Sequence, residues 1–474
     1  MEIVSIQLSD DHSQPKYMQL FEKLKDMILN GEFKPGEKLP AIRYMSTQLG
    51  VNNITVVSSY KHLESNGYVT SRPGSGYYVA KNGPKSPIQE QSSAISTSSS
   101  TLLNQGEQMI NFAVAAPHSS IIPIDAFKRC INEVLERDGA DAFSYQDSNG
   151  YIPLRESIAD ITCNKDKIAA RPSNIQVVSG AQQGLDVISK ALINPGDYVI
   201  CEIPTYDGAI AAFKSRGARI VGVNLQEDGM DLIELEKKVR ICKPKFIYTQ
   251  TTYQNPTCIC YSAEKLTGIL DIACRYGTYI VEDDSMSELC YIEARRQLLK
   301  SLDKEDLVIY LKSLSKLMMP GLRVGFIIMP ENMSEQMTNI KRASDISSSG
   351  LIQRSLDLFL RSGKWEEHRG YMQEIYKCKY EYMQDKLTQL KSIGATFKKP
   401  DGGLCFWVRL PKGLSAQKAY EKCKEMGLLV LPSAVFYENV HRDSDAYLRL
   451  SFASVSIEDI KKGMLILTQC LNGV

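Results

Sequence analysis

Apolar residues in the first 80 positions recur at helical spacing in three segments and then alternate in two short ones. The first helical face is formed by Tyr17, Leu20, Phe21, Leu24, Met27 and Ile28. We expect a second short helix within residues 39–49 and a third that begins at Asn52 or Asn53. Residues 68–70 and 77–79 alternate like strands and flank a glycine-containing turn. Three helices followed by a hairpin favour a winged helix-turn-helix.

A helix-turn-helix places its third helix in the major groove of DNA. Arg43, Lys61 and Arg72 are therefore candidates for phosphate contacts, and Thr55 and Ser58 are candidates to face the groove. The segment is only slightly basic, so on charge and pattern alone a small helical interaction domain is the alternative.

Residues 81–108 are polar, serine-rich and poor in apolar side chains. Such a segment cannot offset its ordering entropy by burial, so we expect a flexible linker. The sequence thus predicts a DNA-binding domain over residues 1–80, a linker over 81–108 and a larger domain over 109–474.

Short β-branched runs alternate with amphipathic segments in the larger domain. The runs that we predict as strands are residues 175–178, 198–201, 219–223, 246–248, 279–281 and 307–310. Helical patterns lie between several of them, one starting at about Leu185. This order favours an α/β fold with a mostly parallel sheet covered on both faces, whose ligands bind at the loops after the strands.

Lys316 stands among small and apolar residues, which lower the pKa of a lysine because they disfavour its charge. A neutral amine can form a Schiff base with an aldehyde. Ser313 and Arg323 flank it with groups suited to a phosphate. Together they indicate pyridoxal 5'-phosphate (PLP). Taken alone, the motif is more often a surface lysine before a turn, and it is the rest of the chain that reverses this interpretation.

Four other loops carry candidates for the same cofactor. Ala181 and Gln182 lie where a helix starts and offer backbone N–H groups to an anion. Tyr206 is a candidate to stack on a ring, Asn255 to bind a phenolate oxygen and Asp283 to keep a pyridine nitrogen protonated. Each also has a structural interpretation: an ordinary helix start, a core tyrosine, an Asn-Pro turn and a solvated strand end.

Composition narrows the class of protein. The 474 residues carry a net charge of +1, which gives no global electrostatic case for nucleic acid or membrane binding. The 12 cysteines lack paired zinc-ligand spacing and fit reduced thiols in a cytoplasm. No signal peptide and no apolar run of about 20 residues is found, so we expect a cytoplasmic protein without membrane contact.

Six separated blocks of the N-terminal region resemble the GntR-type winged helix-turn-helix. They are Pro15-Lys16-Tyr17, Leu39-Pro40-x-x-Arg43, Leu49-Gly50-Val51, Thr55-Val56, Leu63-Glu64-x-x-Gly67-Tyr68 and Arg72-x-Gly74-Ser75-Gly76. Two positions depart from the family. Ala41 replaces a small polar residue, and Asn53 replaces an arginine that the family places near DNA. The departures bear on the DNA contacts and leave the expected fold unchanged.

From about Phe112 to the C-terminus, the order and spacing of Asn255, Asp283 and Lys316 resemble fold-type I PLP enzymes of the aminotransferase class. The resemblance implies a smaller C-terminal α+β subdomain and an internal aldimine on Lys316. It also implies that Asp283 pairs with the pyridinium, that Asn255 bonds the ring oxygen and that Tyr206 stacks on the ring.

The same resemblance assigns the remaining candidates. The phosphate is held by Ala181, Gln182, Ser313 and Arg323. Tyr145 reaches the phosphate of a partner subunit, which implies a homodimer, and Arg449 binds an amino-acid carboxylate bidentately. Serine at 285 or 287 replaces a tyrosine that tunes the ring oxygen, and Cys258 replaces the glycine that ends the Asn-Pro-Thr-Gly turn. We expect PLP to bind, with poor or altered turnover.

A winged helix-turn-helix tethered to an aminotransferase-like domain resembles the MocR subfamily of GntR regulators. This implies a PLP-dependent transcription regulator that binds operator DNA and senses an amine or amino-acid-like effector, or PLP itself, through the Lys316 aldimine. Two alternatives remain. One is an active aminotransferase with an accessory DNA-binding domain, and the other is a domain that keeps the fold without binding PLP.

Overall fold

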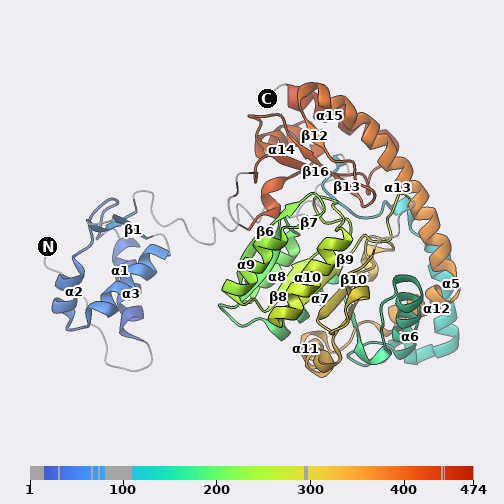
Figure 1. Ribbon diagram of the computed structural model, residues 1–474, viewed down its shortest axis with the longest axis horizontal. Helices are drawn as coiled ribbons and strands as arrows, with labels where there is room; N and C mark the ends of the chain where they lie inside the picture. The colour runs from blue at the N-terminus through green and yellow to red at the C-terminus, as the bar shows by residue number, and fades with distance from the viewer. Residues whose placement is uncertain are drawn as a thin grey trace. The chain divides into compact units, whose positions relative to one another are not determined.

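The computed structural model describes residues 15–29, 32–65, 68–72, 75–80, 109–292, 297–438, 441 and 443–472. The chain divides into two compact units, Met1–Thr97 and Ser98–Val474 (Figure 1). The predicted linker lies outside the described residues, so the predicted domain boundaries stay a prediction. None of the helices in the described part of the chain combines the length and apolar character needed to cross a membrane.

The N-terminal unit contains three helices and a hairpin, and the predicted winged helix-turn-helix is confirmed. Its elements are α1 (Lys16–Leu29), α2 (Ile42–Leu49), α3 (Asn53–Ser65), β1 (Val69–Arg72) and β2 (Gly76–Val79). The strands pair antiparallel, with Val69 opposite Val79 and Arg72 opposite Gly76. The core includes the buried side chains Leu20, Leu24, Met45, Val56, Tyr60, Leu63 and Val79. This core packs α3 against α1 and α2.

The turn between α2 and α3 fixes the direction of the third helix. Gly50 ends α2 in the left-handed conformation at φ 59°, where glycine is favoured. The Asn52 side-chain oxygen accepts a hydrogen bond from the backbone N–H of Ile54 at 3.1 Å. Ser46 donates from its hydroxyl to the Asn53 amide oxygen at 2.7 Å. The amide oxygen of Asn53 therefore joins the two helices.

The C-terminal unit is built on an eight-stranded sheet of order β4-β11-β10-β9-β8-β5-β6-β7. Its strands are β4 (Ile175–Val178), β5 (Tyr198–Ile203), β6 (Arg219–Gln226), β7 (Gly229–Met230), β8 (Phe246–Thr249), β9 (Tyr279–Asp284), β10 (Val308–Ser313) and β11 (Gly325–Ile328). Neighbours from β10 to β6 pair parallel, whereas β11 and β7 pair antiparallel with their neighbours. The expected mostly parallel sheet is confirmed.

Helices cover both faces of this sheet (Figure 1). One face packs on α7 (Ala181–Leu192), α8 (Asp207–Ser215) and α11 (Ser334–Asp345), and the other on α9 (Leu232–Cys242) and α10 (Ala263–Tyr276). Val199 and Cys201 of β5 belong to the first core and Ile200 to the second. The alternation of strand side chains thus supplies two hydrophobic cores from one sheet.

A smaller C-terminal α+β subdomain follows, as expected. Its antiparallel sheet has the order β12-β13-β16-β15, formed by β12 (Thr396–Phe397), β13 (Cys405–Arg409), β15 (Leu431–Pro432) and β16 (Tyr447–Ser451). The helices α14 (Ala416–Glu425) and α15 (Ile457–Asn472) accompany it, and β14 (Leu428–Leu429) pairs with β3 (Ile110–Asn111). The remaining long helices are α5 (Ile124–Asp138), α6 (Ile152–Ile161), α12 (Gly350–Arg361) and α13 (Lys364–Gln389). Figure 1 shows α13 running from the region of α12 to this subdomain.

Several element boundaries differ from the sequence prediction, and three of them involve candidate cofactor residues. β9 continues to Asp284 and β10 to Ser313, and α7 begins at Ala181 rather than near Leu185. The strands run on because Leu311 pairs with Asp283 and Lys312 with Asp284 in the parallel ladder. Charged residues are uncommon inside strands, so the hydrophobic pattern predicted that β9 and β10 end before these residues.

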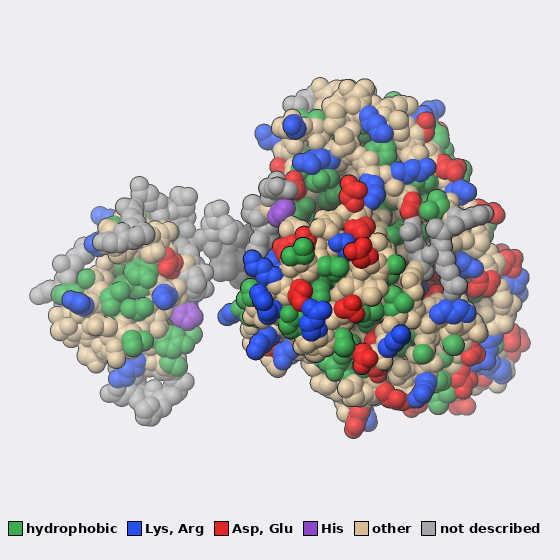
Figure 2. All heavy atoms as spheres, in the orientation of Figure 1, with side chains coloured by type: hydrophobic (Ala, Val, Ile, Leu, Met, Phe, Trp, Pro, Cys, Tyr) green, Lys and Arg blue, Asp and Glu red, His purple; other side chains and the backbone are tan. Residues whose placement is uncertain are grey.

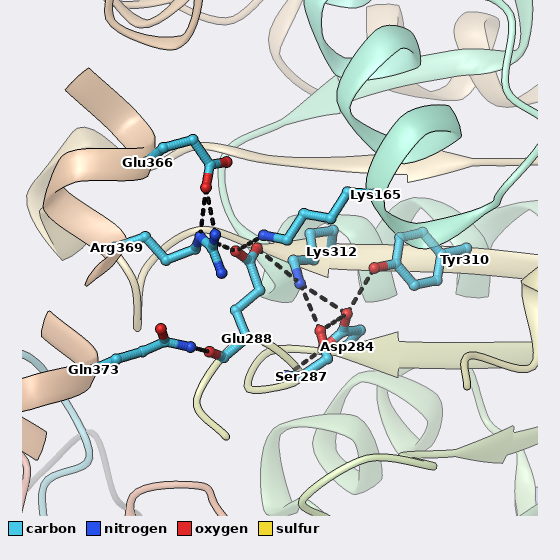
Figure 3. Close-up of polar contacts among 9 residues, drawn as sticks. All are labelled: Lys165, Asp284, Ser287, Glu288, Tyr310, Lys312, Glu366, Arg369 and Gln373. Atoms are coloured by element: carbon cyan, nitrogen blue, oxygen red, sulfur yellow. Dashed lines mark hydrogen bonds and ion pairs between the residues drawn. The ribbon is translucent and has the colours of Figure 1, made fainter. Parts of the chain in front are cut away.

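The charged residues at the ends of β9 and β10 belong to a buried ion cluster (Figure 3). The Lys312 ammonium lies 2.8 Å from an Asp284 carboxylate oxygen and 3.4 Å from Glu288. It also donates to the Ser287 hydroxyl at 3.0 Å, and the Tyr310 hydroxyl donates to Asp284 at 2.6 Å. Burial raises the pKa of Asp284, but the charge of Lys312 and the hydrogen bonds from Lys312, Ser287 and Tyr310 together outweigh it and leave that pKa below its ordinary value.

The cluster extends from the sheet to α13. Glu288 also pairs with Lys165, and the Arg369 guanidinium of α13 lies 3.8 Å from it. Gln373 on the same helix donates to the Glu288 backbone carbonyl at 2.6 Å. Lys312 is therefore the shared partner of two buried carboxylates. Through Glu288 it connects β9 and β10 to α13.

We predict that Lys312→Met destabilises the C-terminal unit by about 3 to 5 kcal/mol, because it leaves Asp284 and Glu288 buried without their shared cation. Urea unfolding followed by tryptophan fluorescence measures this unit, since both tryptophans, Trp365 and Trp407, lie in it. The control is Lys190→Met, which removes an exposed pair with Asp186 on one helix and costs about 0.3 to 0.5 kcal/mol. Equal losses in the two variants would contradict the prediction.

Candidate functional site

Lys316 lies just after β10, at the carboxyl edge of the sheet. Its ammonium group donates to the backbone carbonyl of Ala115, which comes from the segment that precedes α5. Burial lowers the pKa of Lys316 to about 8, and the positive charge of Arg449 contributes. About a tenth of this amine is therefore neutral at pH 7, far more than for an ordinary lysine, and the neutral amine is the nucleophile.

Asp283 is buried at the end of β9, with one carboxylate oxygen held and the other open. The Tyr248 hydroxyl donates to Oδ2 at 2.7 Å and the Gln250 amide at 3.0 Å. Oδ1 is buried without a hydrogen-bond partner. Burial raises the pKa of Asp283 to about 6, although the two hydrogen bonds lower it. An N–H donor carrying positive charge, such as a pyridinium, satisfies the open oxygen.

A cradle for an anion lies at the start of α7. Gly180 precedes the helix at φ 81°, and a Cβ there would lie 2.6 Å from an Arg323 guanidinium nitrogen. Arg323 donates from that nitrogen to the Ser179 carbonyl at 2.8 Å. The backbone N–H groups of Ala181 and Gln182 begin the helix, so its dipole and Arg323 act on the same place.

Ser313 and Tyr206 flank this cradle. Ser313 is the last residue of β10, and its hydroxyl accepts from the backbone N–H of Ser315 at 3.3 Å. Tyr206 precedes α8 and donates to the Gln182 side-chain oxygen at 3.4 Å. Burial raises the pKa of the Tyr206 phenol, so the tyrosine stays neutral. These contacts connect the loops after β4, β5 and β10.

Asn255 and Arg449 meet across the two subdomains. The Arg449 guanidinium of β16 donates to the Asn255 amide oxygen at 2.9 Å and to the Ala113 carbonyl. It lies over the Phe436 ring at 5.4 Å, and its Nε is buried without a partner. A buried guanidinium with an unused donor suits a carboxylate ligand.

Sequence reasoning missed four residues that complete this arrangement. Tyr248 and Gln250 hold Asp283, and Ala113 and Ala115 supply carbonyls to Arg449 and Lys316. A tyrosine and a glutamine at the end of a predicted strand were a weak signal for the first pair. No side-chain signal exists for the second pair, because only their backbone takes part.

Ser285 and Tyr145 do not join these contacts within the chain. Ser285 follows β9 in a partly exposed position. Tyr145 is 84% exposed, and Phe143 beside it is 70% exposed. An exposed pair of large aromatic side chains is unusual on a free surface.

The candidate DNA contacts lie on the N-terminal unit. Arg43 on α2 and Lys61 on α3 are exposed, and Thr55 and Ser58 are partly exposed on α3. Arg72 is the last residue of β1, and its side chain lies outside the described residues. Figure 2 shows acidic and basic side chains interspersed over the visible face of the larger unit.

The donor set fits PLP on the evidence of this site itself. A lysine of lowered pKa, an open buried carboxylate oxygen, an anion cradle and a guanidinium with a spare donor lie at the carboxyl edge of one sheet. They correspond to the aldehyde, the pyridine nitrogen, the phosphate and the carboxylate of a bound amino acid.

Known families match both units. Residues 107–465 match the family "Aminotransferase class I and II", and residues 16–79 match "Bacterial regulatory proteins, gntR family". The chain is 30% identical over 469 residues, 95% of each protein, to "Uncharacterized HTH-type transcriptional regulator YdfD" of Bacillus subtilis. It is 26% identical over 470 residues, 96% of this chain and 94% of the relative, to "Probable rhizopine catabolism regulatory protein MocR" of Rhizobium meliloti.

Solved structures agree with these matches. The α-aminoadipate aminotransferase LysN of Thermus thermophilus, complexed with N-(5'-phosphopyridoxyl)-L-leucine, superposes with a TM-score of 0.75 at 30% identity, covering 81% of this chain and 97% of that one. The kynurenine aminotransferase of Pyrococcus horikoshii, in complex with PMP, gives 0.73 at 29% identity, covering 82% and 94%. The expected PLP-binding fold is confirmed. The chain belongs to the class I and II aminotransferase family and carries a gntR-type DNA-binding domain, which is the architecture of the MocR-type regulators.

Proposed function

We propose that this protein is a PLP-dependent transcription regulator that binds operator DNA through residues 1–80 and senses an amine or amino-acid-like effector through residues 109–474, joined by a linker over 81–108. The observation that carries the proposal is the presence in one chain of a winged helix-turn-helix and of a lysine with pKa about 8 beside an intact cofactor site.

PLP, when bound, supplies an electrophilic carbon for amines and an electron-withdrawing ring. Lys316 is the amine that holds it, Asp283 the partner of its ring nitrogen, and Tyr206 and Asn255 contact its ring. Ala181, Gln182, Ser313 and Arg323 would hold its phosphate. Arg449 would bind the carboxylate of an effector whose amino group competes with Lys316 for the cofactor. Effector binding changes DNA binding only as far as its affinity differs between two arrangements of the protein.

We further propose a homodimer, in which Tyr145 contributes to the cofactor phosphate site of the partner. The support is the exposure of Tyr145 and Phe143 beside a cavity of about 290 Å³ lined by residues 142–145 and 347–351. An exposed aromatic pair next to a hollow is typical of an interface. We expect the regulator to act in the cytoplasm, where its thiols stay reduced.

A working aminotransferase is the second candidate, because Lys316 and Asp283 keep the geometry that amine chemistry needs. A half-reaction assay distinguishes the two. Rapid stoichiometric conversion of bound PLP to the aminated cofactor by a common L-amino acid supports the enzyme, and slow or absent conversion supports the sensor.

We predict that Lys316→Ala abolishes the effector response while DNA affinity stays within about twofold of the wild type, since the lysine belongs to the other unit. The measurement is fluorescence anisotropy of a labelled duplex from upstream of the protein's own gene, titrated with and without the common L-amino acids. Lys304→Ala, which removes an exposed lysine of the same unit, serves as the control and keeps the response. A response that persists in Lys316→Ala removes the lysine from the switch.

We predict that the rate of PLP attachment to the apoprotein rises about tenfold per pH unit up to about pH 8 and then levels off, because only the neutral Lys316 amine reacts. Arg449→Met removes a charge that lowers this pKa, so its plateau moves to higher pH. Stopped-flow absorbance between pH 6 and about 10 follows both proteins. A pH-independent rate, or an unshifted plateau in the variant, contradicts the assignment.

We predict that Arg43→Ala weakens DNA binding and reduces the slope of log K against log salt by about 1, because one phosphate contact is lost. Anisotropy titrations over a series of salt concentrations give the slope. Lys23→Ala removes an exposed cation of α1 and leaves the slope unchanged. Equal slopes for wild type and Arg43→Ala would take Arg43 off the DNA interface.

A further inference from the structure

Two buried cysteine side chains are in contact at the boundary between the two subdomains. They lie close to Asn255 and Arg449, the residues proposed to bind the effector carboxylate. Cys258 lies in the loop after β8, and Cys405 is the first residue of β13. Their sulfur atoms are 3.3 Å apart, close enough for a hydrogen bond between the thiols, and the Cys258 sulfur also lies 3.2 Å from the Cys405 carbonyl oxygen. They are 4% and 2% exposed. Far apart in the sequence, they form a contact that cysteine spacing does not reveal.

Cys258 occupies a backbone position that favours glycine. Its φ is 55°, and this left-handed conformation is unfavourable for a residue with a side chain. Gly403 faces it so closely that a Cβ there would lie 3.0 Å from the Cys258 sulfur. Cys258 therefore has a strained backbone, and the residue facing it has no side chain that would displace its sulfur atom.

We propose that Cys258 and Cys405 are a redox-sensitive pair that a peroxide oxidises to a disulfide, which fastens β13 to the loop bearing Asn255. A disulfide needs a sulfur separation of about 2.05 Å, so the sulfur atoms must approach by about 1.2 Å. Transient disulfides of this kind are the form expected in a reducing compartment. In the described part of the chain, no cluster of three or more His, Cys, Asp or Glu side chains suits a metal ion, which favours oxidation over metal binding.

The two thiols have different roles in the reaction. The hydrogen bond from Cys258 lowers the pKa of Cys405, as do the charges of Arg449 and Lys316. The Cys405 thiolate attacks one peroxide oxygen and breaks the O–O bond, which gives a sulfenic acid and, after protonation, water. The Cys258 thiol then attacks that sulfur and releases a second water. Two electrons pass from the thiols to the peroxide. A reducing thiol later converts the disulfide back to two thiols and is itself oxidised.

The disulfide would change the effector site. Asn255 lies three residues before Cys258 and accepts a hydrogen bond from Arg449, and Trp407 of β13 pairs with Arg449 of β16. A shift of about 1 Å between this loop and β13 moves both carboxylate-binding groups, and misplacements of that size weaken binding about tenfold or more. This part rests on the proposed function, whereas disulfide formation does not.

Peptide mapping of the oxidised full-length protein tests the pair. After hydrogen peroxide treatment, alkylation and trypsin digestion, the wild type gives a linked pair of peptides 246–265 and 399–409 that dithiothreitol separates. The link persists in Cys260→Ser, which changes the neighbouring cysteine of the same peptide, and is absent in Cys258→Ser and Cys405→Ser. The proposal is overturned if no link forms under conditions that oxidise the exposed Cys163, or if Cys258→Ser still links.

The regulatory part has a separate readout. The reduced and oxidised wild-type proteins, loaded with PLP, are titrated with the common L-amino acids while cofactor absorbance is followed. We expect about tenfold weaker apparent affinity after oxidation and no change in Cys405→Ser. A linked protein with unaltered affinity overturns the regulatory part alone. A reduced protein that responds to no amino acid counts against the proposed function and leaves the mapped disulfide standing.

Discussion

The ion pair between Asp284 and Lys312 is the constraint on which the cofactor site depends. It joins the ends of β9 and β10 on the face of the sheet opposite Asp283, at a separation of 2.8 Å with both side chains buried. Neither charge is tolerable there without the other, so the pairing fixes the parallel register of the two strands. That register places Asp283 beside Leu311 and brings Ser313 and then Lys316 to the same edge.

Successive side chains of a strand point to opposite faces of the sheet, so the adjacent residues Asp283 and Asp284 have different surroundings and different roles. Asp284 carries a depressed pKa because Lys312, Ser287 and Tyr310 satisfy its carboxylate. Asp283 faces the other way with one oxygen unsatisfied and a raised pKa. The first stabilises the fold as it stands, while the second is incomplete until a cationic donor arrives. A carboxylate that stabilises the fold and a carboxylate proposed to meet a ligand are thus one residue apart.

Three tertiary contacts described above lie at the boundary between the eight-stranded sheet region and the rest of the C-terminal unit. Arg449 reaches Asn255 across it, Cys405 touches Cys258 across it, and the cluster around Glu288 ties the sheet to α13. Each contact joins residues more than 80 positions apart. The proposed effector recognition and the proposed thiol chemistry therefore involve the same interface, and a change in one is expected to affect the other.

The sequence by itself determined the two architectures and most of the residues proposed for the cofactor site. Helical periodicity and turn residues are local signals, and Lys316, Asp283 and Asn255 follow strands that local patterns reveal. The ends of β9 and β10 could not be read in this way, because Asp283 and Lys312 are polar residues kept in strands by partners from elsewhere. The backbone carbonyls of Ala113 and Ala115, the open oxygen of Asp283 and the contact of Cys258 with Cys405 were decided only by the tertiary structure. The physical reason is that each depends on what a distant segment places beside it, and no residue's own chemistry carries that information.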